Sequence, residues 1–253
     1  IATRVFLSHE PSASGFGISP SVIGSIADVV VCISEAQKSL LVESGCDGSK
    51  IVVVPNGVDL KLFTAGDPEK RNCRRLVFVG ALVVDKGLHL VIDAFVRLRS
   101  KYSDLTLDIY GSAGLWGRAD YLNVEELKKI AGLTFHGAVS QEELATVYRE
   151  AGLLVIPSIY FDAFNLVAAE AQSSGLPAIG SVHGGMKEII VDRVTGRLTE
   201  PTTGEALALV IGELLEKPEQ LRELSRNALA TVRGKFDWTK TAGSIIEAAA
   251  SQI

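Results

Sequence analysis

Short runs of apolar residues alternate along this chain with longer stretches in which apolar residues recur every three or four positions. The short runs are rich in β-branched residues and predict strands at 3–7, 28–33, 50–54, 75–80, 105–110, 133–136, 153–156 and 177–180. Most of them are apolar at consecutive positions, which is typical of strands that are buried on both faces of a parallel sheet.

The longer stretches predict helices at 35–44, 87–100, 141–150, 165–174 and 205–216, and the chain from Thr203 onward is almost wholly helical in pattern. Two of these helices begin with the spacing of a capping box, Ser34 with Gln37 and Ser140 with Glu143. Strands that alternate with helices over this length predict an α/β fold of the doubly wound, Rossmann-like kind.

A domain boundary is expected near residues 55–58. Pro55 ends a predicted strand and Asn56-Gly57 is a strong turn signal, after which residues 59–74 are polar and loop-like. Residues 75–236 contain enough elements for a complete doubly wound domain, whereas residues 1–54 supply only three strands. Because the chain starts at Ile1, without an initiator Met, and enters a strand almost at once, we expect it to be a piece of a longer polypeptide.

Composition narrows the class of protein. The chain has 253 residues, of which 47% are hydrophobic and 22% charged, as in soluble globular proteins. Its net charge of −5 argues against a nucleic-acid-binding surface. The basic group Lys70, Arg71, Arg74 and Arg75 lies in the loop-like segment, where a solvated loop is favoured over a phosphate or membrane contact.

Three cysteines without metal-site spacing favour a reducing, intracellular setting. No apolar run reaches the ~18 residues of a membrane span, and no signal peptide is visible.

The segment 157–177 is the strongest candidate for a functional site. A buried strand ends at Pro157, and a short loop leads into a helix that starts near Phe164. In doubly wound folds, ligands bind where a strand's carboxyl end turns into a helix. The free N–H groups of Phe164, Asn165 and Leu166 would face an anion such as a diphosphate.

Two carboxylates flank this turn. Asp162 precedes the helix and Glu170 lies within it, and each suits the vicinal hydroxyls of a ribose or hexose because a carboxylate accepts two hydrogen bonds at once. Taken alone, the pattern favours a plainer alternative, in which Asp162 caps the helix and Glu170 is exposed. The alanines at 168, 169 and 171 instead indicate tight packing around Glu170, where a charge needs a partner.

Two further turns follow predicted strands. At the first, Gly80 permits close approach of a ligand and Lys86, before Gly87, supplies a positive charge for phosphate; the alternative is an ordinary turn with a solvated Lys. At the second, Gly184-Gly185 would let the loop pass close to a ligand. Glu188, which follows them, is either a helix-start residue or a ligand contact.

The histidines and the absent motifs limit the kinds of catalytic or metal site that the chain can contain. His9 and His183 follow strands at positions suited to function, whereas His89 is interpreted as structural and His136 as a satisfied core residue. The chain contains no Asp-x-Asp triplet, no HExxH, no CxxC and no GxGxxG after a strand. We therefore expect neither a metal site nor a nicotinamide cofactor.

Together these segments resemble the retaining GT-B glycosyltransferases of glycosyltransferase family 4, and the resemblance covers essentially the whole chain. The matching pieces follow the family's order and spacing, at 27–34, 54–59, 79–87, 108–111, 135–140, 155–158, Asp162 with Glu170, 174–177, 184–188 and 195–196. The resemblance implies two Rossmann-like domains that face each other across a cleft. Residues 1–57 would be the carboxyl-terminal part of the acceptor-side domain, 58–236 the nucleotide-sugar domain, and 237–253 a terminal helix that returns to the first domain.

The resemblance also implies roles for the site residues. Glu170 would bind the ribose, Asp162, which replaces a Glu, would contact the donor sugar, and Lys86 would bind the diphosphate. Two positions depart from the family pattern, with Ala81 where an Arg is common and Asn165 where a Gly is common. The other implied donor contacts are Gly80, Phe164, Asn165 and Leu166, the backbone of Gly137, Ala138 and Val139 for the base, and His9 near the reacting carbon.

We therefore predict a retaining, metal-independent glycosyltransferase with His9, Lys86 and Asp162 as catalytic residues and a nucleotide-diphosphate-sugar as donor substrate, not as a cofactor. The alternatives are a fragment or degenerate homologue that binds the nucleotide-sugar without transferring it, and another GT-B enzyme such as a sugar-nucleotide epimerase. The base, the donor sugar and the acceptor (a glycan, a lipid-linked sugar or a small molecule) stay open. We expect a cytoplasmic location, with the inner membrane surface as an alternative.

Overall fold

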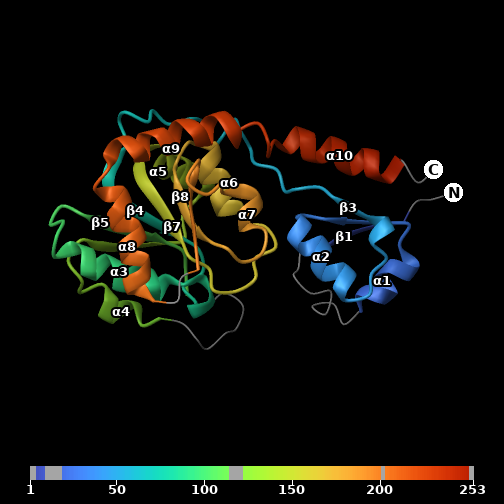
Figure 1. The fold of residues 1–253 in the computed structure, drawn as a ribbon, viewed down its shortest axis with the longest axis horizontal. Helices are drawn as coiled ribbons and strands as arrows, with labels where there is room; N and C mark the ends of the chain where they lie inside the picture. Colours follow the sequence, from blue (N-terminus) through green and yellow to red (C-terminus); the bar gives the residue numbers. More distant parts are fainter. Residues whose placement is uncertain (1–3, 9–18, 114–121, 201–202, 251–253) are drawn as a thin grey trace.

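The computed structural model describes residues 4–8, 19–113, 122–200 and 203–250 of the chain. Two parallel sheets lie side by side, each with its own helices, and a terminal helix extends from the larger unit over the smaller one (Figure 1). The α/β class predicted from the alternation of strands and helices is confirmed. Among the described residues, no helix is both long enough and apolar enough to cross a membrane.

The smaller sheet contains three parallel strands in the order β1-β2-β3: β1 (Val5–Ser8), β2 (Val29–Cys32) and β3 (Ile51–Val53). Helices α1 (Pro20–Ile26) and α2 (Glu35–Glu43) pack on one face, and α10 (Trp238–Ala250) packs on the other. Cys32 of β2 contacts the first layer and Val31 the second. Because successive residues face opposite layers, β2 is apolar at every position.

The larger sheet has six parallel strands in the order β6-β5-β4-β7-β8-β9. They are β4 (Asn72–Val79), β5 (Thr106–Tyr110), β6 (Leu133–Gly137), β7 (Ala151–Ile156), β8 (Ala178–Ser181) and β9 (Gly196–Thr199). The chain winds outward from β4 to one edge, returns at β7 beside β4, and winds outward to the other edge. The strand order therefore reverses between β4 and β7, and such a switch point opens a crevice at the carboxyl ends of the two strands.

Helices cover both faces of this sheet (Figure 1). They are α3 (Leu88–Arg99), α4 (Val124–Leu127), α5 (Gln141–Glu150), α6 (Leu166–Ser173), α7 (Met186–Ile189), α8 (Gly204–Leu215) and α9 (Pro218–Thr231), with the short 3-10 turn η3 (Val84–Lys86) before α3. A second 3-10 turn, η2 (Gly48–Lys50), precedes β3 in the smaller unit. Helix α8 packs on α3, whereas α6 packs on α5 and α9. All five predicted helices are present, with ends within one residue of their predicted bounds.

The capping-box predictions have different outcomes. The box at Ser140 and Glu143 is complete. At the start of α2 only half of it forms, because the Gln37 side chain accepts from the N–H of Ile33, one residue before the cap at Ser34. Gln37 is buried in this position, so its amide satisfies the end of β2 rather than the cap itself.

The predicted basic loop is wrong in part. Arg74 belongs to β4, which begins at Asn72 and so starts before the strand predicted from Arg75 onward, and the Arg71 side chain is buried. The sequence failed to predict α1, α4 and β9, whereas Glu188 lies in the first turn of α7, in agreement with its interpretation as a helix-start residue. Strand β9 is short and mostly polar, so it lacks the apolar run that marks the other strands. The two sheets are separate, and the predicted domain bounds at 57 and 237 stay predictions.

Candidate functional site

A narrow crevice lies at the switch point between β4 and β7. Its volume is about 50 Å³, and it is lined by Phe78, Val79, Gly80, Lys86, Ile156, Ser158, Asn165 and Val167. These residues come from the carboxyl ends of the two strands and from the turns that follow them. The structure therefore brings Gly80 and Lys86, from one predicted turn, together with Asn165, from the other.

Close backbone packing joins the turn after β4 to the turn after β7. Gly87 has a φ of +73°, and a Cβ atom there would lie 2.3 Å from the carbonyl oxygen of Pro157. The N–H of Ile159 donates to the carbonyl oxygen of Asp85 over 2.9 Å. A glycine is required at position 87 because the two turns touch there, and the contact fixes where η3 presents Lys86.

Lys86 and Asp162 form an ion pair across this crevice. Nζ of Lys86 lies 3.0 Å from Oδ2 of Asp162, and Nδ2 of Asn165 donates to the same oxygen over 2.9 Å. The side chains of Lys86 and Asp162 are 36% and 17% exposed, so the pair is partly accessible to solvent. Lys86 is thus not a free solvated cation, and Asp162 does not cap α6. The cap is Asn165, whose Oδ1 accepts the N–H of Ala168.

The glycines after β8 have a different role from the predicted one. A Cβ atom on Gly184 would lie 2.2 Å from the carbonyl oxygen of Asp162, and one on Gly185 would lie 2.1 Å from that of Ala163. The N–H of Gly185 donates to the carbonyl oxygen of Asp162 at a distance of 2.8 Å. The backbone of residues 162–163, not a ligand, therefore makes the close approach to these glycines. This contact holds the Asp162 backbone in place, in addition to the side-chain contacts of Asp162 with Lys86 and Asn165.

Glu188 makes a contact that neither sequence interpretation included. It lies on α7. Its carboxylate accepts hydrogen bonds from the N–H groups of Glu35 and Ala36, at the start of α2 in the smaller unit, and both N···O distances are 3.0 Å. The first N–H groups of a helix have no partner within the helix, and the helix dipole favours an anion there. The contact joins the two units beside the loop that holds Asp162.

Glu170 lies on α6 and is 9% exposed, so the alternative of an exposed helix residue is wrong. Burial raises the pKa of its carboxyl group to about 7. The buried Tyr148 hydroxyl on α5 lies beside it and offsets part of this rise, although their geometry falls short of a regular hydrogen bond. As the alanines around it indicated, the carboxyl group is in a tightly packed place.

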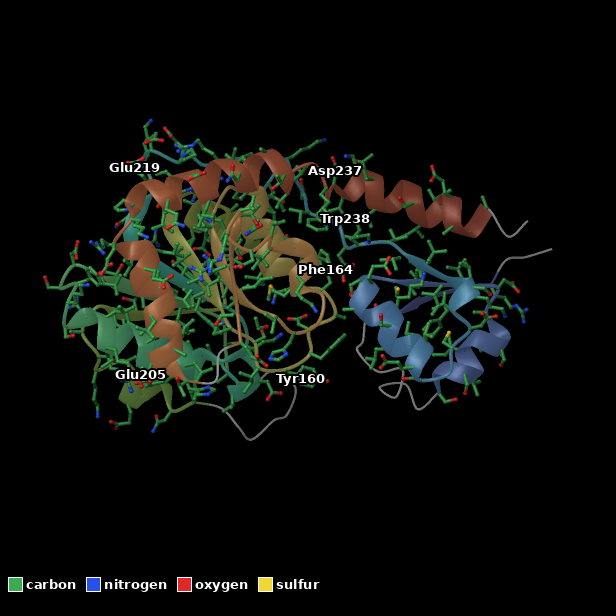
Figure 2. All side chains as sticks on the ribbon, in the orientation of Figure 1. Tyr160, Phe164, Glu205, Glu219, Asp237 and Trp238 are labelled. Atoms are coloured by element: carbon green, nitrogen blue, oxygen red, sulfur yellow. The ribbon has the colours of Figure 1, made fainter. Side chains whose placement is uncertain are left out.

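The other predicted donor contacts occupy separate places. Phe164 is 7% exposed, and its ring meets the edge of Phe236 with centroids 5.3 Å apart; Figure 2 shows it at the side of the larger unit that faces the smaller one. Leu166 is exposed. Gly137, at the end of β6, has a φ of +75° and open space where a Cβ atom would lie. Ala138 and Val139 follow it into the turn before α5.

Val139 also borders a second, open groove, which has a volume of about 640 Å³ and runs along α5. This groove is lined as well by Arg75, Tyr110, His136 and Glu150. His136 stacks on Tyr110 with centroids 4.4 Å apart, and its Nε2 atom lies 2.8 Å from Oδ1 of Asp108. Its side chain is 33% exposed. His136 has partners, as predicted, but it lies at the border of the groove and not in the core.

The remaining candidates are placed as follows. His183 is half-buried in the loop after β8, and His89 is half-buried on α3. His9 lies outside the described residues. Within the part of the chain that the structure describes, no group of three or more His, Cys, Asp or Glu side chains is arranged to hold a metal ion.

Comparison with known proteins gives consistent matches. The family described as "Glycosyl transferases group 1" matches residues 64–231, and the one described as "Glycosyltransferase Family 4" matches residues 21–62. A D-inositol 3-phosphate glycosyltransferase of Segniliparus rotundus is 32% identical over 211 residues, which are 79% of this chain and 46% of the relative. An MMP alpha-(1->4)-mannosyltransferase of Mycolicibacterium hassiacum is 30% identical over 226 residues, 89% of this chain and 54% of the relative. The chain thus spans about half the length of the curated relatives it matches.

Solved structures share the fold. Anabaena Alr3699/HepE in complex with UDP-glucose has a TM-score of 0.84 at 22% identity, over 98% of this chain and 72% of that one. The sucrose-phosphate synthase of Thermosynechococcus elongatus has a TM-score of 0.77 at 24% identity, over 96% and 66% of the two chains. These neighbours are GT-B glycosyltransferases, so the predicted GT-B type of fold is confirmed.

Proposed function

Because the chain belongs to the group 1 glycosyl transferases, we propose that it carries the donor-binding half of a retaining enzyme that transfers a sugar from a nucleotide-diphosphate donor. The observation that carries the proposal is the crevice at the switch point, where Lys86, Asp162 and the start of α6 meet. A cation and free helix N–H groups suit a diphosphate. A carboxylate beside them suits the hydroxyls of the sugar attached to it.

The donor would lie along the carboxyl end of the larger sheet. Its diphosphate would face Lys86 and the N–H groups of Phe164, Asn165 and Leu166, with Gly80 leaving room on the β4 side. Glu170 would accept hydrogen bonds from the ribose hydroxyls, and the turn at 137–139 would meet the base. Gly137 supports this last assignment, since the space above it is open.

In the transfer, the bond between the sugar's anomeric carbon and the diphosphate oxygen breaks, and a bond from the same carbon to an acceptor hydroxyl oxygen forms on the same face. The hydroxyl proton passes to the departing phosphate, so the step needs no separate base. Negative charge grows on the diphosphate as it leaves. Lys86 and the α6 N–H groups would stabilise that charge in the place a metal ion takes in other enzymes. His9 is proposed to lie near the reacting carbon.

The donor's identity is open among the common bases. One structural neighbour, Anabaena Alr3699/HepE, is in complex with UDP-glucose, which makes uridine diphosphate the first ligand to test on this chain. A thermal-shift screen against uridine, guanosine and adenosine diphosphates selects the base, because a ligand that binds only the folded state raises its apparent stability.

Replacing Glu170 tests the assignment directly. We expect Glu170→Ala to weaken nucleoside-diphosphate binding about tenfold or more in calorimetry, since a hydrogen bond to a charged group is worth ~1.5–3 kcal/mol. Glu205→Ala is the control, because Glu205, in the first turn of α8, is not among the residues that line the crevice, and Figure 2 shows it apart from Phe164 at the turn before α6. An affinity unchanged by Glu170→Ala would contradict the ribose role.

A second candidate is a chain that binds the nucleotide-sugar without transferring it. The presence of Ala81 where the family commonly has Arg favours it, because Lys86 is then the one basic side chain among the residues that line the crevice. A turnover assay on the full-length parent protein separates the two. Release of nucleotide from a sugar donor, dependent on an acceptor, supports the enzyme, and its absence with every donor supports the binding protein.

A further inference from the structure

Asn165 uses both ends of its side-chain amide. Oδ1 accepts the N–H of Ala168 over 2.9 Å and caps α6, and Nδ2 donates to Oδ2 of Asp162, also over 2.9 Å. The cap determines the orientation of the amide, because only its oxygen can accept an N–H group. The amide nitrogen is therefore directed at Asp162 for as long as the helix is capped.

The two partners of the Asp162 carboxylate differ in mobility. Asn165 is 8% exposed and fixed by the cap, whereas the Lys86 side chain is 36% exposed and ends a flexible four-carbon stem. The backbone of Asp162 is fixed as well, by its contacts with Gly184 and Gly185. Anything that draws Lys86 away would leave the carboxylate attached to Asn165.

Resting on the proposed function, we propose that Asn165 is a positioning residue for the donor sugar, which holds the Asp162 carboxylate in place when Lys86 leaves it for the diphosphate. A diphosphate carries more negative charge than one carboxylate, so the Lys86 ammonium group is attracted more strongly to the diphosphate than to Asp162. Asp162 keeps one hydrogen bond, from Asn165, and its remaining lone pairs face the sugar hydroxyls. Without that bond the carboxylate would rotate freely once Lys86 had moved.

This arrangement divides the donor's affinity between residues. Lys86 and Glu170 serve the nucleoside diphosphate, whereas Asp162, held by Asn165, serves only the sugar. The ratio of nucleotide-sugar affinity to nucleoside-diphosphate affinity therefore reports the position of Asp162. A substitution that merely loosened α6 would lower both affinities together and leave this ratio unchanged.

Asn165→Ser is the sharpest variant, because its hydroxyl still caps a helix but provides no amide nitrogen for Asp162. With the diphosphate and sugar nucleotide of the base selected above, calorimetry should give a diphosphate affinity within about twofold of wild type and a nucleotide-sugar affinity about tenfold lower. Asn165→Asp, which also caps, should shift the ratio the same way. Thr203→Ser, a cap substitution at the start of α8, should change neither affinity.

Asp162→Asn tests the exchange itself. It removes the anion that Lys86 pairs with at rest, so the affinity for nucleoside diphosphate should rise while the ratio falls. A diphosphate affinity that stays the same or drops would overturn the exchange.

Equal losses for both ligands in Asn165→Ser and Asn165→Asp would overturn the positioning role, and so would a ratio unchanged in both. A wild-type chain that binds neither ligand would instead overturn the proposed function, and the inference with it. The two failures are therefore distinguishable in one set of titrations.

Discussion

At the scale of single residues, the Glu170 carboxyl group combines burial with a proposed role that needs its charge. Burial raises its pKa from 4.5 to about 7, so near neutrality the group is divided between its protonated and ionised forms. The ionised form accepts hydrogen bonds from two hydroxyls, whereas the protonated form must use one oxygen as a donor. Nucleotide binding and folding should therefore respond to pH in opposite directions.

The stability prediction follows from the higher pKa in the folded state. Between pH 4.5 and about 7 the unfolded chain has released this proton and the folded chain retains it, so the free energy of unfolding falls as pH rises. At ~1.4 kcal/mol per pH unit the contribution is at most about 3 kcal/mol. Urea titrations at pH 5 and pH 8 give the fall in the free energy of unfolding between these pH values. This fall should be larger in the wild type than in Glu170→Gln by about this amount. An equal fall in both proteins would contradict the raised pKa of Glu170.

At the scale of elements, helix α6 carries Glu170 and Asn165, and guanidinium groups hold its carboxyl end. Arg71 donates to the carbonyl oxygens of Tyr148, Ala151 and Ser174, and Arg233 donates to that of Ser173. Cations suit this end of a helix because its last carbonyl groups have no partner within it and its dipole is negative. Burial lowers the pKa of Arg71 to about 10, which leaves it charged at neutral pH.

Arg71→Met should therefore destabilise the larger unit strongly. The methionine fills similar space but leaves buried carbonyl oxygens without a charged donor, and we expect a loss of about 3 kcal/mol or more. Arg226→Met is the control, because Arg226 makes an exposed ion pair with Glu69 and such pairs contribute roughly 0–1 kcal/mol. Chemical denaturation followed by circular dichroism measures both, and equal effects would contradict a special role for Arg71.

At the scale of the whole molecule, α10 and Glu188 both make contacts that join the units. Helix α10 follows the larger unit in the chain and lies on the smaller sheet, where Oγ1 of Thr241 donates to the carbonyl oxygen of Pro55. Figure 2 shows Asp237 and Trp238 where the chain crosses from the larger unit to the smaller one. Glu188 contacts the start of α2. Since α7 adjoins the Gly184-Gly185 loop that fixes Asp162, the Glu188 contact relates the position of the smaller unit to the crevice.

Glu188→Gln should weaken the contact at α2. A glutamine has one accepting oxygen and no charge, so the amide N–H groups of Glu35 and Ala36 should exchange with deuterium about tenfold faster or more. Glu219→Gln, on α9 at the far end of the larger unit, should leave that exchange unchanged (Figure 2). Protection at Glu35 and Ala36 that survives in Glu188→Gln would mean that the carboxylate does not hold the two units together.

The pattern of the sequence by itself determined the α/β class, the buried strands and the long helices, because periodicity depends only on which faces of an element are covered. It also marked Lys86, Asp162 and Asn165, since glycines and polar residues after apolar runs stand at strand ends, and it marked Glu170 by the alanines around it. Where a strand is short and polar, as β9 is, no such signal exists.

Only the tertiary structure decided which partners these residues have. Nothing in the sequence indicated that Lys86 pairs with Asp162, that Asn165 rather than Asp162 caps α6, or that Glu188 reaches the smaller unit, 152 and 153 positions away. Such contacts depend on how the sheet order brings distant turns together, which local pattern does not encode. The sequence alone therefore marked the turns that border the crevice, and the fold determined which partners their side chains have.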